Sequence, residues 1–207
     1  MHVMCISARP AMVEHMSHQP SARELIPVAA QKFTALVHGV PKDMWAAQTP
    51  CSDWSTRDLV NHVVSEHFWA PHLLGGETVD QVGDRYDGDL LGDDPVSAWD
   101  KAITQSLNAF ASVEDEQPVN LSFGTVPVDE YANQMLVDLT VHAWDLAGGS
   151  HQDERLDEHT VAHALAYVQE HAEDMAGSGL FSEPVKVDSD DPQDQLLALL
   201  GRDPRED

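Results

Sequence analysis

Apolar residues recur every three or four positions over most of the chain, which is the pattern of amphipathic helices. Ser55 and Asp58 form a capping-box sequence before one such segment, and Asp94 followed by Pro95 marks the start of the next. Glycines follow several of these segments, as they do at many helix ends. The pattern predicts helices over residues 22–39, 55–74, 95–112, 128–147 and 156–176.

Weaker patterns fill the remaining chain. Residues 77–94 are rich in Gly and Asp and are predicted to be a loop, whereas VNLSFGTVPVDEY, around Gly124, predicts a short hairpin. Near the C-terminus, PVKV is strand-like and QDQLLALLG predicts a brief helix. The fold class is therefore mostly α, an up-down bundle with a short hairpin and a small C-terminal extension. We expect residues 1–20 to be a flexible tail and 21–207 to be one domain.

Composition narrows the class of protein. The chain has 207 residues, 42% of them hydrophobic, and a net charge of −25. Such a charge disfavours nucleic acid and anionic membrane surfaces as partners. It indicates either a heavily solvated, salt-adapted surface or an acidic patch for a basic partner. Two cysteines, Cys5 and Cys51, cannot form a disulfide framework, and neither a secretory signal nor an apolar run of membrane-spanning length is present, so we expect a cytoplasmic protein.

Three polar residues occupy one face of the predicted helix 128–147. Asp138, His142 and Asp145 follow the spacing of core-facing positions, where apolar residues are usual. A buried carboxylate without a partner is costly, and a metal ion would supply that partner. The alternative is that Asp138 and His142 form an exposed or salt-bridged pair on the solvent side.

A third candidate ligand, His62, lies midway along the predicted helix 55–74 with Leu59 and Val63 beside it. It is either an ordinary buried histidine or the partner of the Asp138–His142 pair. Glu66 follows four residues later and is a reserve ligand or a candidate catalytic base. Cys51 lies beyond the reach expected from His62, and we interpret it as structural.

Four segments carry a family resemblance. TPCSDWSTRDLVNHVV, LGDDPVSAWDKA, VDLTVHAWDLAGG and LLALLGRDP resemble, in this order, segments of actinobacterial DinB-like proteins with a mycothiol-dependent maleylpyruvate isomerase type metal-binding domain. The resemblance covers about residues 22–204 and implies a DinB/YfiT-like four-helix bundle with one divalent metal, usually zinc. It implies that His62, Asp138 and His142 are the metal ligands. The isomerase itself has Glu at the acidic position and a further C-terminal domain, so the resemblance does not assign maleylpyruvate isomerisation to this chain.

Three functions fit these residues. The first is a thiol-dependent metalloenzyme, a transferase or isomerase that uses mycothiol or a similar thiol on a small electrophile, with hydrolysis as a variant. Glu66 and Asp145 are its candidate catalytic or ligand-orienting residues, and Arg57 and Arg85 its candidate cofactor-binding cations. The second is a non-catalytic metal- or ligand-binding bundle with a stress or regulatory role. The third is a structural helical protein with a hydrogen-bonded polar core. The metal identity remains open among zinc, nickel, iron and copper, and a homodimer is possible.

Overall fold

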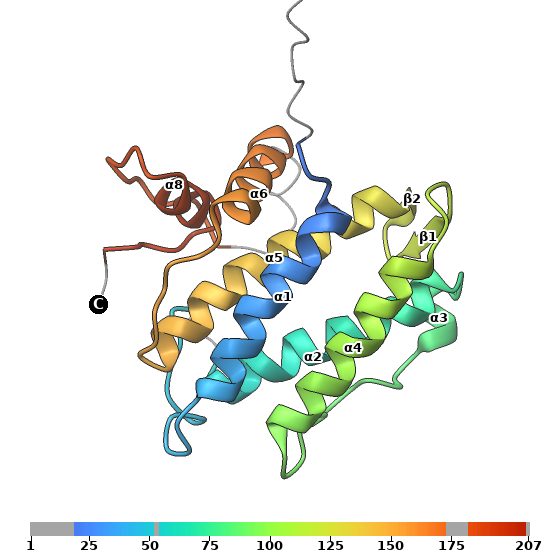
Figure 1. Ribbon diagram of the computed structural model, residues 1–207, viewed down its shortest axis with the longest axis horizontal. Helices are drawn as coiled ribbons and strands as arrows, with labels where there is room; N and C mark the ends of the chain where they lie inside the picture. The colour runs from blue at the N-terminus through green and yellow to red at the C-terminus, as the bar shows by residue number, and fades with distance from the viewer. Residues whose placement is uncertain (1–18, 52–53, 173–181, 206–207) are drawn as a thin grey trace, which may run out of the picture.

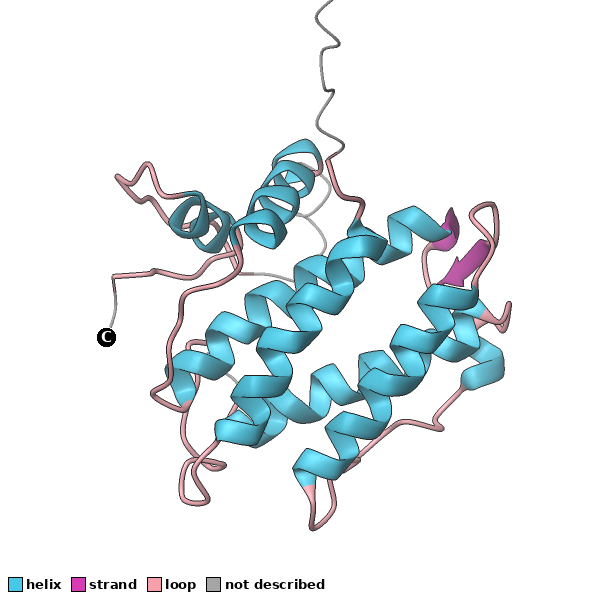
Figure 2. Cartoon of the chain, in the orientation of Figure 1, coloured by secondary structure: helices cyan, strands magenta, loops and turns pink. Residues whose placement is uncertain are grey.

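The computed structural model describes residues 19–51, 54–172 and 182–205 (Figure 1). Its helices and strands follow one another along the chain in the order helix, helix, short helix, helix, hairpin, helix, helix, helix (Figure 2). They are α1 (Ala22–Gly39), α2 (Thr56–Leu74), α3 (Val79–Val82), α4 (Pro95–Ser112), β1 (Pro118–Leu121), β2 (Gly124–Pro127), α5 (Val128–Gly149), α6 (Glu158–Glu170) and α8 (Pro192–Leu199). The mostly helical fold expected from the hydrophobic pattern is confirmed.

Local side-chain caps explain where the long helices begin. Ser55 accepts a hydrogen bond from the backbone N–H of Asp58, and the Asp58 carboxylate accepts one from the Ser55 N–H. Asp94 caps α4 in the same way through the N–H of Ser97, with proline in the first turn. These caps satisfy N–H groups that a helix start leaves without intrahelical partners. The two helix starts predicted from these residues are confirmed.

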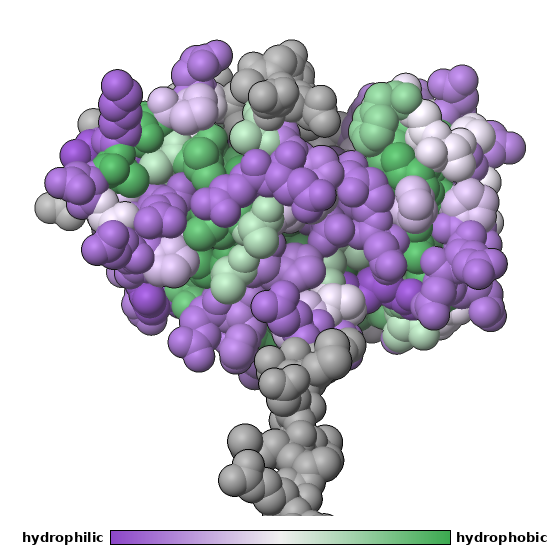
Figure 3. Space-filling model, turned by 90° about the horizontal axis from the view of Figure 1, so that it is seen from above, coloured by the Kyte–Doolittle hydropathy of each residue, from purple (hydrophilic) through white to green (hydrophobic). Residues whose placement is uncertain are grey.

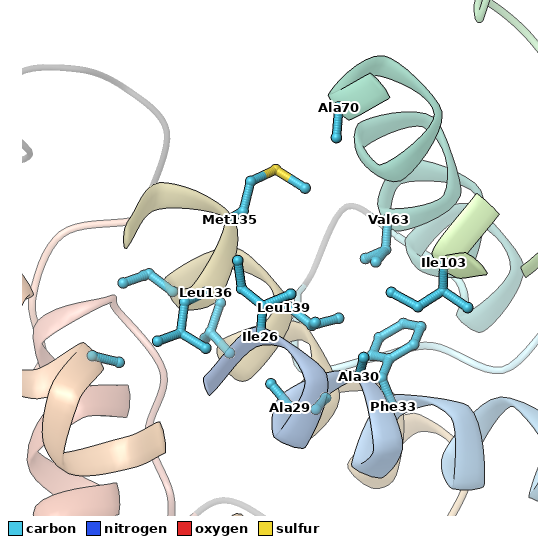
Figure 4. Close-up of a cluster of buried hydrophobic side chains, with 14 of the residues drawn as sticks. Ile26, Ala29, Ala30, Phe33, Val63, Ala70, Ile103, Met135, Leu136 and Leu139 are labelled. Carbon is cyan, nitrogen blue, oxygen red and sulfur yellow. The ribbon is translucent and has the colours of Figure 1, made fainter. Parts of the chain in front are cut away.

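The long helices α1, α2, α4 and α5 pack around one apolar core. Helix α1 lies against α5 and α4, and α2 lies against α4 and α5 (Figure 1). Side chains from all four meet in the middle, where Phe33 and Ile26 approach Leu139 and Val63 (Figure 4). Phe33 also packs against Trp99, with ring centroids 4.6 Å apart. Burial of this apolar surface supplies the main driving force for the arrangement.

Two peripheral parts flank this core. Helices α6 and α8 pack together beside α5, on the side away from the hairpin (Figure 1). Strands β1 and β2 pair antiparallel, with Leu121 opposite Gly124, and connect α4 to α5. Seen from above, hydrophilic residues cover most of the surface (Figure 3), in keeping with the acidic composition. No helix among the described residues is long and apolar enough to cross a membrane.

Three predictions of secondary structure need correction. Residues 184–187 form no strand. Val185 donates a backbone hydrogen bond to Ala198, but a β-strand requires a series of such bonds with a neighbouring strand. The predicted loop 77–94 contains the short helix α3, which begins at a Thr78–Gln81 capping box. Helix α6 ends at Glu170, earlier than predicted, and residues 173–181 lie outside the described part of the chain. So does the predicted N-terminal tail, except for its last two residues.

Candidate metal centre

The side chains of His62, Asp138 and His142 converge between α2 and α5. His62 projects from α2, while Asp138 and His142 lie one turn apart on α5. The Nε2 atoms of His62 and His142 lie 3.3 Å and 3.4 Å from the same carboxylate oxygen, Oδ1 of Asp138. Candidate donor atoms of all three residues fall within 4.8 Å of one another. The structure thus brings together the three residues that the sequence singled out.

Two of the distances within this donor set fit a tetrahedral metal site. Zinc lies about 2.0–2.1 Å from nitrogen and oxygen ligands, which separates neighbouring tetrahedral donors by about 3.3 Å. Both distances to the Asp138 oxygen match that separation. Three donors leave one tetrahedral position open, as in catalytic rather than structural zinc sites. The side chains of His62 and Asp138 are 28% and 24% exposed, so solvent reaches part of this cluster.

A buried carboxylate fixes the orientation of one imidazole. Asp145 lies one turn after His142 and accepts a hydrogen bond from its Nδ1 at 3.0 Å. This bond keeps a proton on Nδ1 and directs Nε2 of His142 towards Asp138. The Asp145 side chain is fully buried, and its charge is balanced by Arg202, whose Nη2 lies 2.8 Å from Oδ2. A carboxylate behind a ligating histidine is the usual support of a metal site.

Charge and burial oppose each other at Asp138 and His142. Burial favours a neutral carboxyl, but the two imidazoles hold the pKa of Asp138 well below its usual range. Burial also disfavours a charged His142, yet Asp138 and Asp145 raise the pKa of this histidine to about 9. The metal-free chain therefore carries a proton on His142 at neutral pH. The surrounding carboxylates favour a positive charge at this point, whether a proton or a metal ion supplies it.

Trp54 packs against both imidazoles. Its ring centroid lies 4.6 Å from that of His62 and 5.5 Å from that of His142. The loop carrying Trp54 is held by Thr49, whose hydroxyl donates to the Trp54 carbonyl. A side chain at Gly149 would displace this loop, because an added Cβ would lie 2.7 Å from Cγ2 of Thr49. The indole therefore restricts the rotation of both candidate ligands.

Glu66 faces the same region from α2. Burial, followed by the charge of Asp138, raises the pKa of its carboxyl. The next histidine on α2, His67, points elsewhere and bonds to Ser106 in the core at 2.9 Å. Burial lowers the pKa of His67 to about 4. The charges of all three converging residues act on Glu66, so its carboxyl is a candidate group to hold or release a proton beside them.

The two candidate cofactor-binding arginines pair with acidic residues of the 77–94 segment. The Nη2 atom of Arg57 lies 2.9 Å from each carboxylate oxygen of Asp89. Arg85 reaches Glu77 at 3.6 Å and His72 at 3.0 Å. Neither arginine hydrogen-bonds to a converging residue. Their proposed role in cofactor binding stays a prediction.

Sequence reasoning singled out neither Arg202 nor Trp54 as a residue of the site. Arg202 lies 57 residues after Asp145, and no periodicity links the two. One signal was present, because LLALLGRDP was among the segments that carried the family resemblance. The charge of Cys51 is among those that raise the pKa of Arg202, and the structural role expected of this cysteine stays a prediction.

The chain is similar to known proteins in sequence and in fold. Residues 27–147 match the model of the mycothiol maleylpyruvate isomerase N-terminal domain. Uncharacterized proteins from two strains of Mycobacterium tuberculosis are 30% identical over 184 residues, covering 84% of this chain and 93% of theirs. Crystal structures of mycothiol-dependent maleylpyruvate isomerase and of its histidine-to-alanine mutant share the fold, with TM-scores of 0.58 and 0.60 at 15% identity, over 76% of this chain and 72% of theirs. The chain therefore belongs to the mycothiol maleylpyruvate isomerase N-terminal domain family.

Proposed function

We propose that this chain is a thiol-dependent metalloenzyme that transfers or isomerises a small electrophile. His62, Asp138 and His142 hold one divalent ion, for which zinc is the best match. The observation that carries the proposal is the donor set, with two imidazole nitrogens 3.3 Å and 3.4 Å from one carboxylate oxygen and a fourth position open. Membership of a family named after a mycothiol-dependent enzyme supports mycothiol, or a similar small thiol, as the co-substrate.

The ion would supply one kind of chemistry, the deprotonation of a coordinating thiol at neutral pH. The chain's own residues set the conditions for it. Asp138 contributes one negative charge, which leaves the site with a net positive charge that favours an anionic thiolate. Asp145 holds His142 with Nε2 available for ligation. Trp54 covers the imidazole rings and limits the approach of water from its side.

Metal content of purified protein tests the ligand assignment. We expect about one ion per chain in the wild type, as for a single three-ligand site. His62→Ala and His142→Ala should each lose most of it. His38→Ala is a matched control, because His38 also lies 2.9 Å from a carboxylate, that of Asp100, but on the surface. Unchanged metal content in both ligand variants would refute the proposal.

A second function, metal binding without catalysis, is favoured by one specific observation. The cations Arg57 and Arg85 are already paired with Asp89 and Glu77, so neither provides an evident grip for an anionic substrate. A panel of small electrophiles, incubated with the metal-loaded chain with and without mycothiol, separates the two functions. Turnover that depends on both thiol and His142 supports the enzyme. Metal binding with no turnover across the panel supports the binding protein.

A further inference from the structure

The hydroxyl of Tyr131 is the one fully buried side-chain polar atom, among the described residues, that has no hydrogen-bond partner. Tyr131 itself is only 4% exposed. A buried hydroxyl without a partner is unfavourable by more than a typical hydrogen bond contributes, and native proteins rarely retain one without a reason. Tyrosine also differs from phenylalanine only by this group, so packing alone does not require it here.

The position of Tyr131 relates this hydroxyl to the candidate metal centre. Tyr131 lies on α5 seven residues before Asp138 and eleven before His142, so the three share one face of the helix. Its ring stacks on Phe110, with centroids 5.8 Å apart, and this contact restrains the phenol. Besides burial, the charges that act on the phenol come from Glu66 and Asp138, and they raise its pKa well above the usual value. Tyr131 therefore stays protonated, and its hydroxyl is able to donate a hydrogen bond.

Glu66 shares this location from the facing helix. It lies one turn after His62 on α2, and it makes no hydrogen bond with another described residue. No arginine or lysine of the described chain forms an ion pair with Glu66 or Asp138. With a metal ion and a thiolate bound, the positive charge of the site would be cancelled. A second negative group beside Glu66 would then be repelled, whereas an uncharged oxygen would not.

We propose that Tyr131 donates a hydrogen bond to an uncharged carbonyl oxygen of the electrophile, in a subsite beside His62, Asp138 and His142. The ligand class is an ester, amide, ketone or aldehyde carbonyl rather than a carboxylate. Such an oxygen supplies the acceptor that the Tyr131 hydroxyl lacks, and it is tolerated beside Glu66. The hydroxyl positions the electrophile; it forms and breaks no covalent bond. This inference rests on the proposed function, because the subsite has a role only next to an open metal position.

Binding of small thiols to the cobalt-loaded chain tests the subsite without an enzymatic assay. Coordination of a thiolate to cobalt gives a charge-transfer absorption that can be titrated. The probes are methyl esters of mercaptoacetate, mercaptopropionate and mercaptobutyrate, which scan the distance from sulfur to carbonyl. Alkanethiols of matched length lack the carbonyl, and the free mercapto acids replace it by a carboxylate.

Tyr131→Phe removes the hydroxyl and keeps the ring that stacks on Phe110. The wild type should bind at least one ester about tenfold more tightly than the matched alkanethiol, and Tyr131→Phe should lose that difference. Alkanethiol affinity should be the same in both. Tyr86→Phe is the matched control, because its hydroxyl is bonded to His72 at 2.7 Å and lies outside the subsite. This control should retain the ester preference.

Glu66→Gln provides a second measurement that does not depend on Tyr131. The wild type should bind the free mercapto acids more weakly than the esters. Glu66→Gln should reduce this difference in affinity. Equal ester affinity in the wild type and Tyr131→Phe would overturn the subsite while leaving the proposed function intact. The absence of any cobalt–thiolate absorption in the wild type would overturn the proposed function, and the subsite with it. Free acids that bind best of all would overturn the choice of an uncharged carbonyl.

Discussion

Arg202 clamps Asp145 from the far end of the chain: its Nε and Nη2 atoms lie 3.3 Å and 2.8 Å from the two carboxylate oxygens. Both side chains are buried, and Asp145 in turn bonds to His142. The C-terminal segment is therefore connected to the candidate metal centre through two buried, charged contacts. Removing one partner of such a buried charged pair is usually strongly destabilising.

Arg202→Met should destabilise the protein because it removes the cation that balances the buried Asp145 and leaves His142 as its remaining charged partner. We expect a loss of about 3–5 kcal/mol in the free energy of unfolding, measured by urea denaturation. Metal affinity should fall about 10–100-fold, because His142 loses its fixed orientation. Arg155→Met is the control: Arg155 pairs with Asp191 on the surface, and its removal should cost less than about 1 kcal/mol.

The double variant Asp145→Asn/Arg202→Met separates the effect of the buried charge on stability from the effect of lost side-chain packing. It should recover a large part of the stability lost in Arg202→Met, since the buried negative charge is gone. If the double variant is as unstable as the sum of the two single variants, the charge pair is not the cause.

Metal binding should release about one proton at about pH 7.5, because the pKa of His142 is raised to about 9 and its Nε2 must lose a proton to bind metal. Isothermal titration in two non-coordinating buffers with different ionisation enthalpies measures this release. Raising the pH above about 9.5 should abolish it. Metal binding with no proton release at neutral pH would contradict ligation through His142.

Acid should destabilise the fold through His67. Its pKa is about 4 in the folded protein against an ordinary 6.5, so the unfolded chain takes up a proton first as the pH falls. The contribution of neutral His67 is complete above about pH 6.5 and is lost towards pH 4, for a total of about 3 kcal/mol. Denaturation at several pH values measures how the free energy of unfolding depends on pH. His67→Gln should weaken this pH dependence, whereas His38→Gln, on the surface, should not.

Trp54→Leu should weaken metal binding about tenfold, because both imidazoles gain rotational freedom when the indole is removed. Trp45→Leu is the control, since Trp45 also packs partly buried against the core but makes no ring contact with His62 or His142. Direct titration with zinc measures both affinities. Equal losses in the two variants would mean that the effect comes from the loop as a whole.

Helix positions could be predicted from sequence because capping acts within a few residues. The pair Ser55–Asp58 and the sequence Asp94–Pro95 each carry a complete signal. The convergence of Asp138 and His142 with His62 could also be anticipated, since one helix face carries polar residues in place of apolar ones. Whether these residues ligate a metal was beyond what spacing alone could decide.

Contacts between distant segments could not be predicted. Nothing in the pattern around Arg202 indicates a partner 57 residues earlier, because its neighbours are a short apolar run. Tyr131 occupies an apolar position of α5 and so resembles an ordinary core residue. The strand prediction for residues 184–187 was wrong because β-type residues form a strand only beside a partner strand, and this segment has none among the described residues.

All three candidate ligands come from α2 and α5, whose contact lies within the apolar core. Among the described residues, no side chain of the 77–94 segment or the hairpin hydrogen-bonds to one of these candidate ligands. Relatives could therefore exchange these outer segments and acquire new substrate preferences without rebuilding the metal centre. Within such a family, the composition of the outer segments would differ with the substrate of each member, while the two helices would keep the same candidate ligands.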